Sequence, residues 1–156
     1  MKMVNDLPTS IQFASYILHC AQNRNLAPNL TKIQKWTYIS YGLHLAVSQG
    51  QTFLFEEKPY CWPHGPVFPQ VFYAQKDYPN SFIHYYQNFN FTPYDPLVDF
   101  VFMRWGNWSA TALSEWSHRQ NTAWEKAGRK DPHTPHRIAL DPHDIHEDFK
   151  EYIKSA

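Results

Sequence analysis

The chain has 156 residues, of which 43% are hydrophobic and 17% aromatic, which is enough for the core of one domain and too apolar for an intrinsically disordered protein. Its 14 basic and 14 acidic residues give a formal net charge of zero, whereas proteins that bind nucleic acid usually carry a basic excess. Composition therefore disfavours nucleic acid as a partner, and residues 1–156 are expected to form a single domain.

The ends and the cysteines of the chain bear on its location. No apolar stretch follows Lys2 as it would in a signal peptide, and no run of roughly 18 apolar residues could span a membrane. Cys20 and Cys61 are too few for a disulfide framework. The sequence thus predicts a cytoplasmic protein without a membrane partner.

Two capping boxes mark the first two predicted helices. In this motif a hydroxyl at the helix start and an amide three residues later satisfy unpaired backbone groups. Residues 9–12 predict a helix from Thr9 to about Asn23, and residues 31–34 predict a second helix from Thr31 to a C-cap at Gly50. Because the second helix is apolar on most sides, we expect it at the centre of the fold.

Prolines interrupt the helical pattern after the second helix. Three prolines between residues 51 and 67 exclude a continuous helix, so we expect a short strand or an extended segment at residues 60–62 and a rigid turn at Gly65-Pro66. A third helix is predicted from about Pro69 to Asp77, where proline is tolerated in the first turn.

The remaining chain is expected to be loop and helix. Residues 78–94 lack periodicity and are interpreted as an aromatic-rich loop. Four further helices are predicted, namely one capped by Asp95 and closed by Gly106, one from Ser109 to His118, one opened by a capping box at Thr122 and ended by Gly128, and one that starts at Asp141-Pro142 and buries Ile145, Phe149 and Ile153. The predicted fold is mainly α, a compact single-domain bundle of about six to seven helices with at most a small β-hairpin near residues 51–67.

Three segments carry motifs that occur in a fixed order. The first lies at residues 30–38 and continues through residues 42–46, the second at residues 62–67, and the third at residues 113–124. Together they resemble the Panacea antitoxin domain, also called SocA-like. The residues that carry the resemblance, which we expect to be structural, are Thr31, Gln34, Trp36, Tyr38, Trp62, Gly65, Pro66, Val67, Leu113, His118 and Trp124.

The resemblance implies a function. Members of this family neutralise a toxin encoded beside them, often by direct protein contact, and at least one delivers its toxin to a protease. The expected partners are therefore a cognate protein toxin and, in the second case, a protease. No catalytic residues are established for the domain, so none is carried over and no cofactor is expected.

The aromatic-rich loop is the first candidate for partner binding. Tyrosine and tryptophan dominate protein-binding hot spots, and loops carry most variable recognition. We therefore predict that Tyr85, Tyr86, Phe89 and Phe91 form part of a toxin-binding surface. The competing interpretation is that these rings cover the core.

Three further residues are candidate partner contacts. Lys32 and Lys35 lie in the first turns of an apolar helix, where they either form a solvated rim with their stems on the core or contact an acidic toxin surface. His64 lies beside the Gly65-Pro66 turn, which either seats Trp62 in the core or presents His64 to the partner.

Catalysis and metal binding have little support in the sequence. His118 and Trp124 are expected to be a buried or half-buried structural pair, and the histidines at 133, 136, 143 and 146 do not complete a zinc-protease motif. No catalytic or metal site is predicted. The alternatives to an antitoxin are a protein of a phage or mobile element that binds a host factor, and an enzyme built around His118 or the C-terminal histidines.

Overall fold

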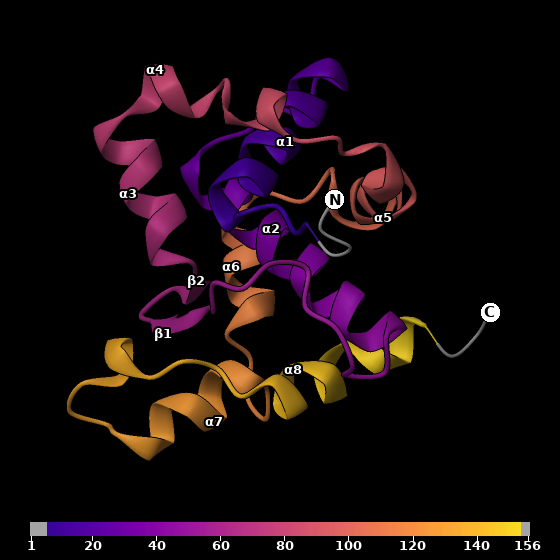
Figure 1. Ribbon diagram of the computed structural model, residues 1–156. Helices are drawn as coiled ribbons and strands as arrows, with labels where there is room; N and C mark the ends of the chain where they lie inside the picture. The colour runs from indigo at the N-terminus through magenta and orange to yellow at the C-terminus, as the bar shows by residue number, and fades with distance from the viewer. Residues whose placement is uncertain (1–5, 154–156) are drawn as a thin grey trace.

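The computed structural model describes residues 6–153, shown as a ribbon in Figure 1. Its first half contains α1 (Ser10–Asn23), α2 (Leu30–Val47), β1 (Tyr60–Trp62), β2 (Gly65–Val67), α3 (Pro69–Asp77) and α4 (Pro79–Phe82). Its second half contains α5 (Asp95–Trp105), α6 (Ala110–Ser117), α7 (Ala123–Lys130) and α8 (Pro142–Phe149). Four 3-10 turns lie at Tyr85–Asn88 (η1), Thr92–Tyr94 (η2), Pro135–Arg137 (η3) and Lys150–Tyr152 (η4). The prediction of a mainly α fold with a small hairpin is confirmed.

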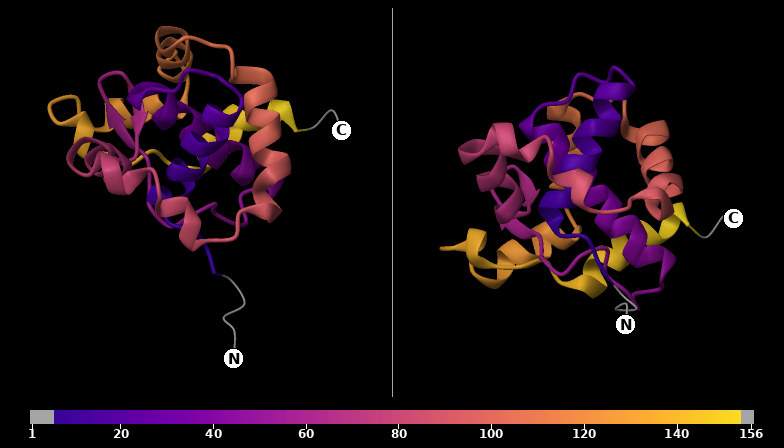
Figure 2. Two further views of the ribbon diagram at one scale, coloured as in Figure 1. Left: turned by 90° about the horizontal axis from the view of Figure 1, so that it is seen from above. Right: turned by 45° about the horizontal axis from the view of Figure 1, so that its top comes forward.

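Helix α2 occupies the centre, as its composition predicted. It contacts α1, α3, α5, α6 and α8, and Figures 1 and 2 show these elements arranged around it. Trp36, Ile39 and Leu43 are fully buried on it, and the Trp36 indole Nε1 donates a hydrogen bond to Trp105 O at 3.0 Å. A helix surrounded on most sides has little solvent-facing surface for charged side chains, and Lys32 and Lys35 are the lysines of α2, which has no Asp, Glu or Arg.

The first two helices begin at different kinds of cap. Helix α1 has the predicted capping box between Thr9 and Gln12. The predicted box at Thr31 is wrong, because Asn29 caps α2 and accepts a hydrogen bond from Lys32 N at 2.8 Å. Asparagine is at least as good an N-cap as threonine, so the earlier of the two candidates starts the helix and leaves Thr31 exposed in its first turn.

The end of α2 also differs from the prediction. Its C-cap is Ser48, and the chain then reverses through two residues with positive φ, Gln49 at 56° and Gly50 at 81°. Gln49 N donates a hydrogen bond to Ala46 O at 3.0 Å and Gly50 N donates one to Leu45 O at 2.8 Å, so Gly50 helps to cap the helix from two residues beyond the C-cap position. The prediction that α2 ends near Gly50 was correct, but the C-cap residue is Ser48, two residues before the predicted one.

Three later helix ends need similar corrections. Asp95 lies inside α5, whose N-cap is Tyr94, and its carboxylate accepts a hydrogen bond from the Tyr16 hydroxyl. The predicted capping box at Thr122 is wrong, because the Thr122 hydroxyl donates to Arg119 O and the Glu125 carboxylate accepts from Asn121 N. Helix α7 also continues past Gly128 to Lys130. The caps at Ser109 and Asp141 are confirmed.

The hairpin lies where the sequence placed it, with a shifted turn. Strands β1 and β2 are antiparallel, with Tyr60 opposite Val67 and Trp62 opposite Gly65, so the turn is formed by Pro63 and His64. The predicted turn at Gly65-Pro66 is therefore wrong, and these two residues belong to β2. Gly65 has a φ of 118°, a backbone conformation that residues with a side chain rarely adopt, which explains the need for glycine there.

The segment at 78–94 is more structured than a loop. It contains α4, η1 and η2, which together connect α3 to α5 along one side of the molecule (Figure 1). The additional helix α4 accounts for the larger number of helices than predicted. Within residues 6–153 no helix is both long and apolar enough to cross a membrane. The prediction about a leader near Lys2 falls on residues outside the described range.

Candidate functional site

The residues that carried the motifs converge on the hairpin. Gln34 makes two hydrogen bonds to the backbone of Phe68, donating to its carbonyl at 3.0 Å and accepting from its N–H at 2.9 Å. Lys35 Nζ donates to Pro66 O at 3.0 Å. Both side chains come from α2, so the polar groups of the central helix hold the residues that follow the hairpin turn.

The third motif segment binds the other strand and the turn. The Ser114 hydroxyl donates to His64 O at 2.6 Å, and the Trp124 indole donates to Trp62 O at 2.7 Å. Cys61 Sγ donates to Trp124 O at 3.3 Å. We call Gln34, Lys35, Ser114, Trp124 and the two strands the hairpin cluster. The first and third motif segments thus meet at the hairpin, which contains the second motif segment.

The remaining motif residues have structural positions. His118 and Trp124 are half-buried with ring centroids 5.3 Å apart, which confirms the expected pair. Trp62 is also half-buried and packs on Phe72 with 5.2 Å between centroids, so it lies at the edge of the core and not within it. The buried members of the whole motif set are Gln34, Trp36, Tyr38, Gly65, Pro66, Val67 and Leu113.

Lys35 contradicts the expected solvated rim. It is 2% exposed, and the loss of hydration lowers the pKa of its ammonium to about 8. A Cβ at Gly65 would lie 2.4 Å from Ser117 Oγ and 3.1 Å from Lys35 Nζ, so the absence of a side chain at Gly65 leaves room for the Ser117 hydroxyl and for the ammonium beside it. A buried Lys35 has no access to a toxin surface.

Lys32 and His64 lie nearer the surface. Lys32 is half-buried, and its Nζ donates to Ala27 O at 3.2 Å and lies 6.0 Å from the centre of the Trp36 ring. His64 is exposed at the hairpin turn. Their predicted contacts with a partner remain predictions.

In the aromatic segment, residues 78–94, most of the aromatic rings pack against the core, although most of the other side chains are exposed. Phe91 is 4% exposed and stacks on Tyr16 with 4.5 Å between ring centroids, so its predicted place in a partner surface is wrong. Tyr86 is half-buried and stacks on His19 at 4.3 Å. Tyr85 and Phe89 are also half-buried. The competing interpretation, that the rings cover the core, holds for Phe91, and the other three rings keep part of their surface in solvent.

A cleft opens beside Phe89. It has a volume of about 970 Å³ and lies between the start of α1, the chain before β1 and the end of the aromatic segment. We call it the carboxylate cleft, and its lining includes Asp6, Thr9, Gln12, Glu56, Glu57, Asn88, Phe89, Asn90, Pro93 and Tyr94. Glu57 accepts a hydrogen bond from Ser10 N at 3.1 Å, which places one carboxylate at the N-terminus of α1.

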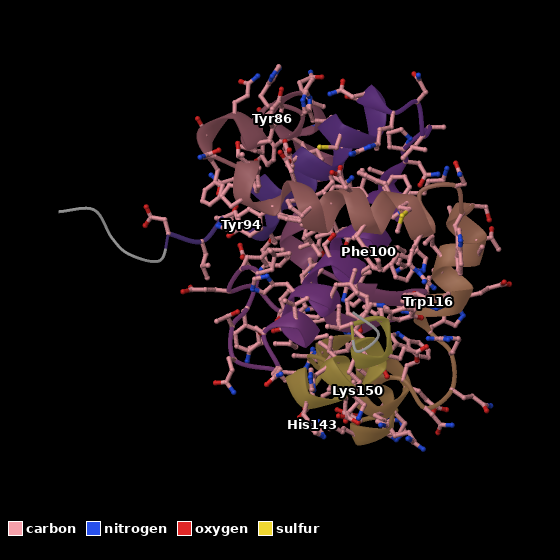
Figure 3. All side chains as sticks on the ribbon, turned by 90° about the vertical axis from the view of Figure 1, so that its right-hand side faces the viewer. Tyr86, Tyr94, Phe100, Trp116, His143 and Lys150 are labelled. Atoms are coloured by element: carbon pink, nitrogen blue, oxygen red, sulfur yellow. The ribbon has the colours of Figure 1, made fainter. Side chains whose placement is uncertain are left out.

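An apolar groove adjoins this cleft. It has a volume of about 550 Å³ between the end of α2, the first half of α5 and the segment after α8, and Pro93 lines both hollows. We call it the apolar groove, and it is lined by Leu43, His44, Val47, Pro93, Pro96, Leu97, Phe100, Tyr152 and Ile153. Figure 3 looks onto this side, with Tyr94 at the start of α5 and Phe100 further along it. Cleft and groove together form the Pro93 face.

Sequence reasoning missed most of the Pro93 face. Of its lining, Phe89 alone was predicted to bind a partner. Glu56 and Glu57 stand in an irregular stretch where adjacent acidic residues usually mean solvated surface, and Leu97 and Phe100 have the spacing of ordinary core positions. No local signal distinguishes such residues, because a groove forms between elements and not within one.

Side chains that could bind a metal are dispersed over the described part of the chain. Between residues 6 and 153 no group of three or more His, Cys, Asp and Glu side chains is placed to hold an ion. Burial raises the pKa of the Cys61 thiol, and desolvation is also the largest effect on Cys20, whose pKa is raised. Neither thiol is activated as a nucleophile in this arrangement.

Comparison of the chain with protein families, with curated proteins and with solved structures found no match in any of the three.

Proposed function

We propose that this protein is a cytoplasmic antitoxin of the Panacea-like type, which neutralises a cognate toxin by binding it directly. The proposal rests on the resemblance in sequence and on one structural observation, the convergence of the three motif segments in the hairpin cluster. Chance similarity in three short segments gives no reason for them to touch, whereas a shared fold does. The bonds from Lys35, Ser114 and Trp124 to consecutive parts of one hairpin join the three segments into one packed unit, which supports the proposal.

The surface also suits binding to another protein. Large apolar side chains that stay exposed or half-exposed around a groove favour a protein partner, since removing them from water stabilises a complex. Val47 is 61% exposed at the edge of the apolar groove, and Leu97 and Phe100 are half-buried within it. A standard interface buries roughly 1,200–2,000 Å² in total, so cleft and groove would form the centre of one and not its whole extent.

Co-expression tests the proposed function. The neighbouring gene is expressed in three ways: alone, together with the wild-type gene for this protein, and together with a frameshifted copy of the gene for this protein. Growth arrest by the neighbour alone, relieved by the wild type and not by the frameshift, is the expected result. A neighbour that is harmless alone, or whose toxicity the wild type does not change, would contradict the proposal.

The same strains separate two routes of neutralisation. If the protein occludes the toxin, toxin and antitoxin should co-purify in equal amounts and the toxin should persist in the cell. If the protein delivers the toxin to a protease, the lifetime of the toxin should shorten in its presence and recover when the protease is deleted.

A further inference from the structure

The two halves of the Pro93 face differ in charge. Three carboxylates line the cleft, from Asp6, Glu56 and Glu57, and none of its described lining residues is lysine or arginine. No salt bridge joins these carboxylates to another residue between 6 and 153. In a chain with no net charge, this is a local excess of negative charge. It creates an attractive potential for a cation.

The aromatic wall of the cleft suits the same ligand. Phe89 and Tyr94 are half-buried, and their ring centroids are 6.2 Å apart. Aromatic faces attract ammonium and guanidinium groups, and carboxylates bind them through charge-assisted hydrogen bonds. A lysine or arginine side chain would find both kinds of contact in the cleft.

The apolar groove has the opposite character. Its lining contains one titratable side chain that could carry positive charge, His44, and burial lowers the pKa of this imidazole. The His44 ring also lies 3.0 Å from the Thr52 hydroxyl, so its polar edge is occupied. The groove therefore offers apolar contact next to a cleft that offers negative charge, with Pro93 between them.

We propose that the Pro93 face binds a basic amphipathic segment of the toxin, with apolar side chains in the groove and a lysine or arginine side chain in the cleft. This inference rests on the proposed antitoxin function, and it adds the chemistry of the partner. Charge complementarity selects the occupant, because a neutral or acidic apolar segment would leave the carboxylates of Asp6 and Glu56 without a cationic partner beside the interface.

Synthetic peptides test this chemistry on the intact protein. The probe is an amphipathic helical peptide with leucines along one face and arginines beside them. One control peptide has glutamate for every arginine, and another has serine for every leucine. We expect the first peptide to bind at least about tenfold more tightly than either control, a difference of about 1.4 kcal/mol, in isothermal titration calorimetry.

Matched variants locate the binding. Glu56→Lys reverses an exposed charge in the cleft, and Glu115→Lys makes the same change on α6, outside both hollows. Val47→Ser removes an apolar side chain from the groove, and Leu30→Ser removes one that is 53% exposed elsewhere. The first member of each pair should weaken binding about tenfold and the second should not, with circular dichroism showing that all four variants are folded.

The outcomes separate the two proposals. Equal binding of the arginine and glutamate peptides, or equal effects of Glu56→Lys and Glu115→Lys, would overturn the inference about the partner. If the wild type then still relieves toxicity in co-expression, the antitoxin function stands and the toxin binds elsewhere. If the arginine peptide binds as expected but no neighbouring toxin is neutralised, the proposed function fails while the face remains a receptor for basic amphipathic segments.

Discussion

The hairpin cluster and the Pro93 face use their polar residues in different ways. In the hairpin cluster the side chains of Gln34, Lys35 and Trp124 are directed at backbone groups of the same chain, and those of Gln34 and Lys35 are buried. On the Pro93 face the carboxylate of Glu56 and the side chain of Val47 point into solvent. The polar residues of the motifs thus stabilise the fold, while most of the surface that suits a partner comes from segments without a motif, with Leu43 and His44 as the exceptions.

The largest expected effect comes from the backbone of the hairpin cluster. Gly65→Val should cost about 4 kcal/mol of unfolding free energy, because valine is strained at φ of 118° and its Cβ would meet Ser117 Oγ and Lys35 Nζ. Urea unfolding followed by tryptophan fluorescence measures the change.

Gly50→Ala is the matched control. Gly50 also has positive φ, at 81°, but an added Cβ would meet nothing within 4 Å. It should cost about 1 kcal/mol, the backbone strain alone. Similar costs for the two variants would mean that the space beside Lys35 is not tightly packed.

A smaller loss is expected from Gln34→Ala. The substitution leaves the N–H of Phe68 buried without its partner and removes a buried side chain, although the Phe68 carbonyl keeps its hydrogen bond from Phe72 N, so the cost should be about 3 kcal/mol. Gln70→Ala, on the exposed side of α3, should change stability by less than about 0.5 kcal/mol. If Gln34→Ala were as mild as its control, the pairing with Phe68 would be incidental to the fold.

Lys35 should make stability depend on pH. The unfolded chain binds the proton with a pKa near 10.5 and the folded chain with a pKa of about 8, so between these values the unfolded state holds more protons. Stability must then rise as pH increases from 8 to 10.5, by at most about 3 kcal/mol, and stay flat below pH 8 as far as Lys35 is concerned.

Lys35→Met isolates this contribution. Other groups titrate in the same range, so the quantity to compare is the difference in unfolding free energy between wild type and variant at each pH. That difference should shift in favour of the wild type as pH rises from 8 to 10.5. A constant difference would show that Lys35 is hydrated in the folded protein.

The smallest effect on stability is expected on the Pro93 face. Phe89→Ser should cost about 1 kcal/mol of stability, because the ring is half-buried, and should weaken toxin binding about tenfold or more if the face is the contact. Tyr73→Ser, which is 51% exposed on α3, serves as the control and should leave toxin affinity unchanged. If Phe89→Ser left the affinity for the toxin unchanged, the toxin would bind elsewhere, and the Pro93 face could no longer be contrasted with the hairpin cluster as a binding surface.

The sequence predicted which helices form more accurately than it predicted the residues at which they begin and end. The capping box at Thr9 and the caps at Ser109 and Asp141 were predicted correctly. Asn29 and Thr31 are both good caps two residues apart, and sequence alone does not rank them. The hairpin turn was misplaced for a related reason, since Gly65-Pro66 suits a turn as well as it suits the strand conformation it adopts.

The sequence by itself determined that the chain is mainly helical and that α2 is central, because apolar periodicity, capping residues and prolines act over a few neighbouring residues. It also contained the three motif segments in their order along the chain. The tertiary structure decided that Lys35 is buried, that Phe91 belongs to the core and that Glu56 and Phe89 share a cleft. Burial and clefts depend on which elements pack together, and that information is distributed over contacts between residues far apart in the chain.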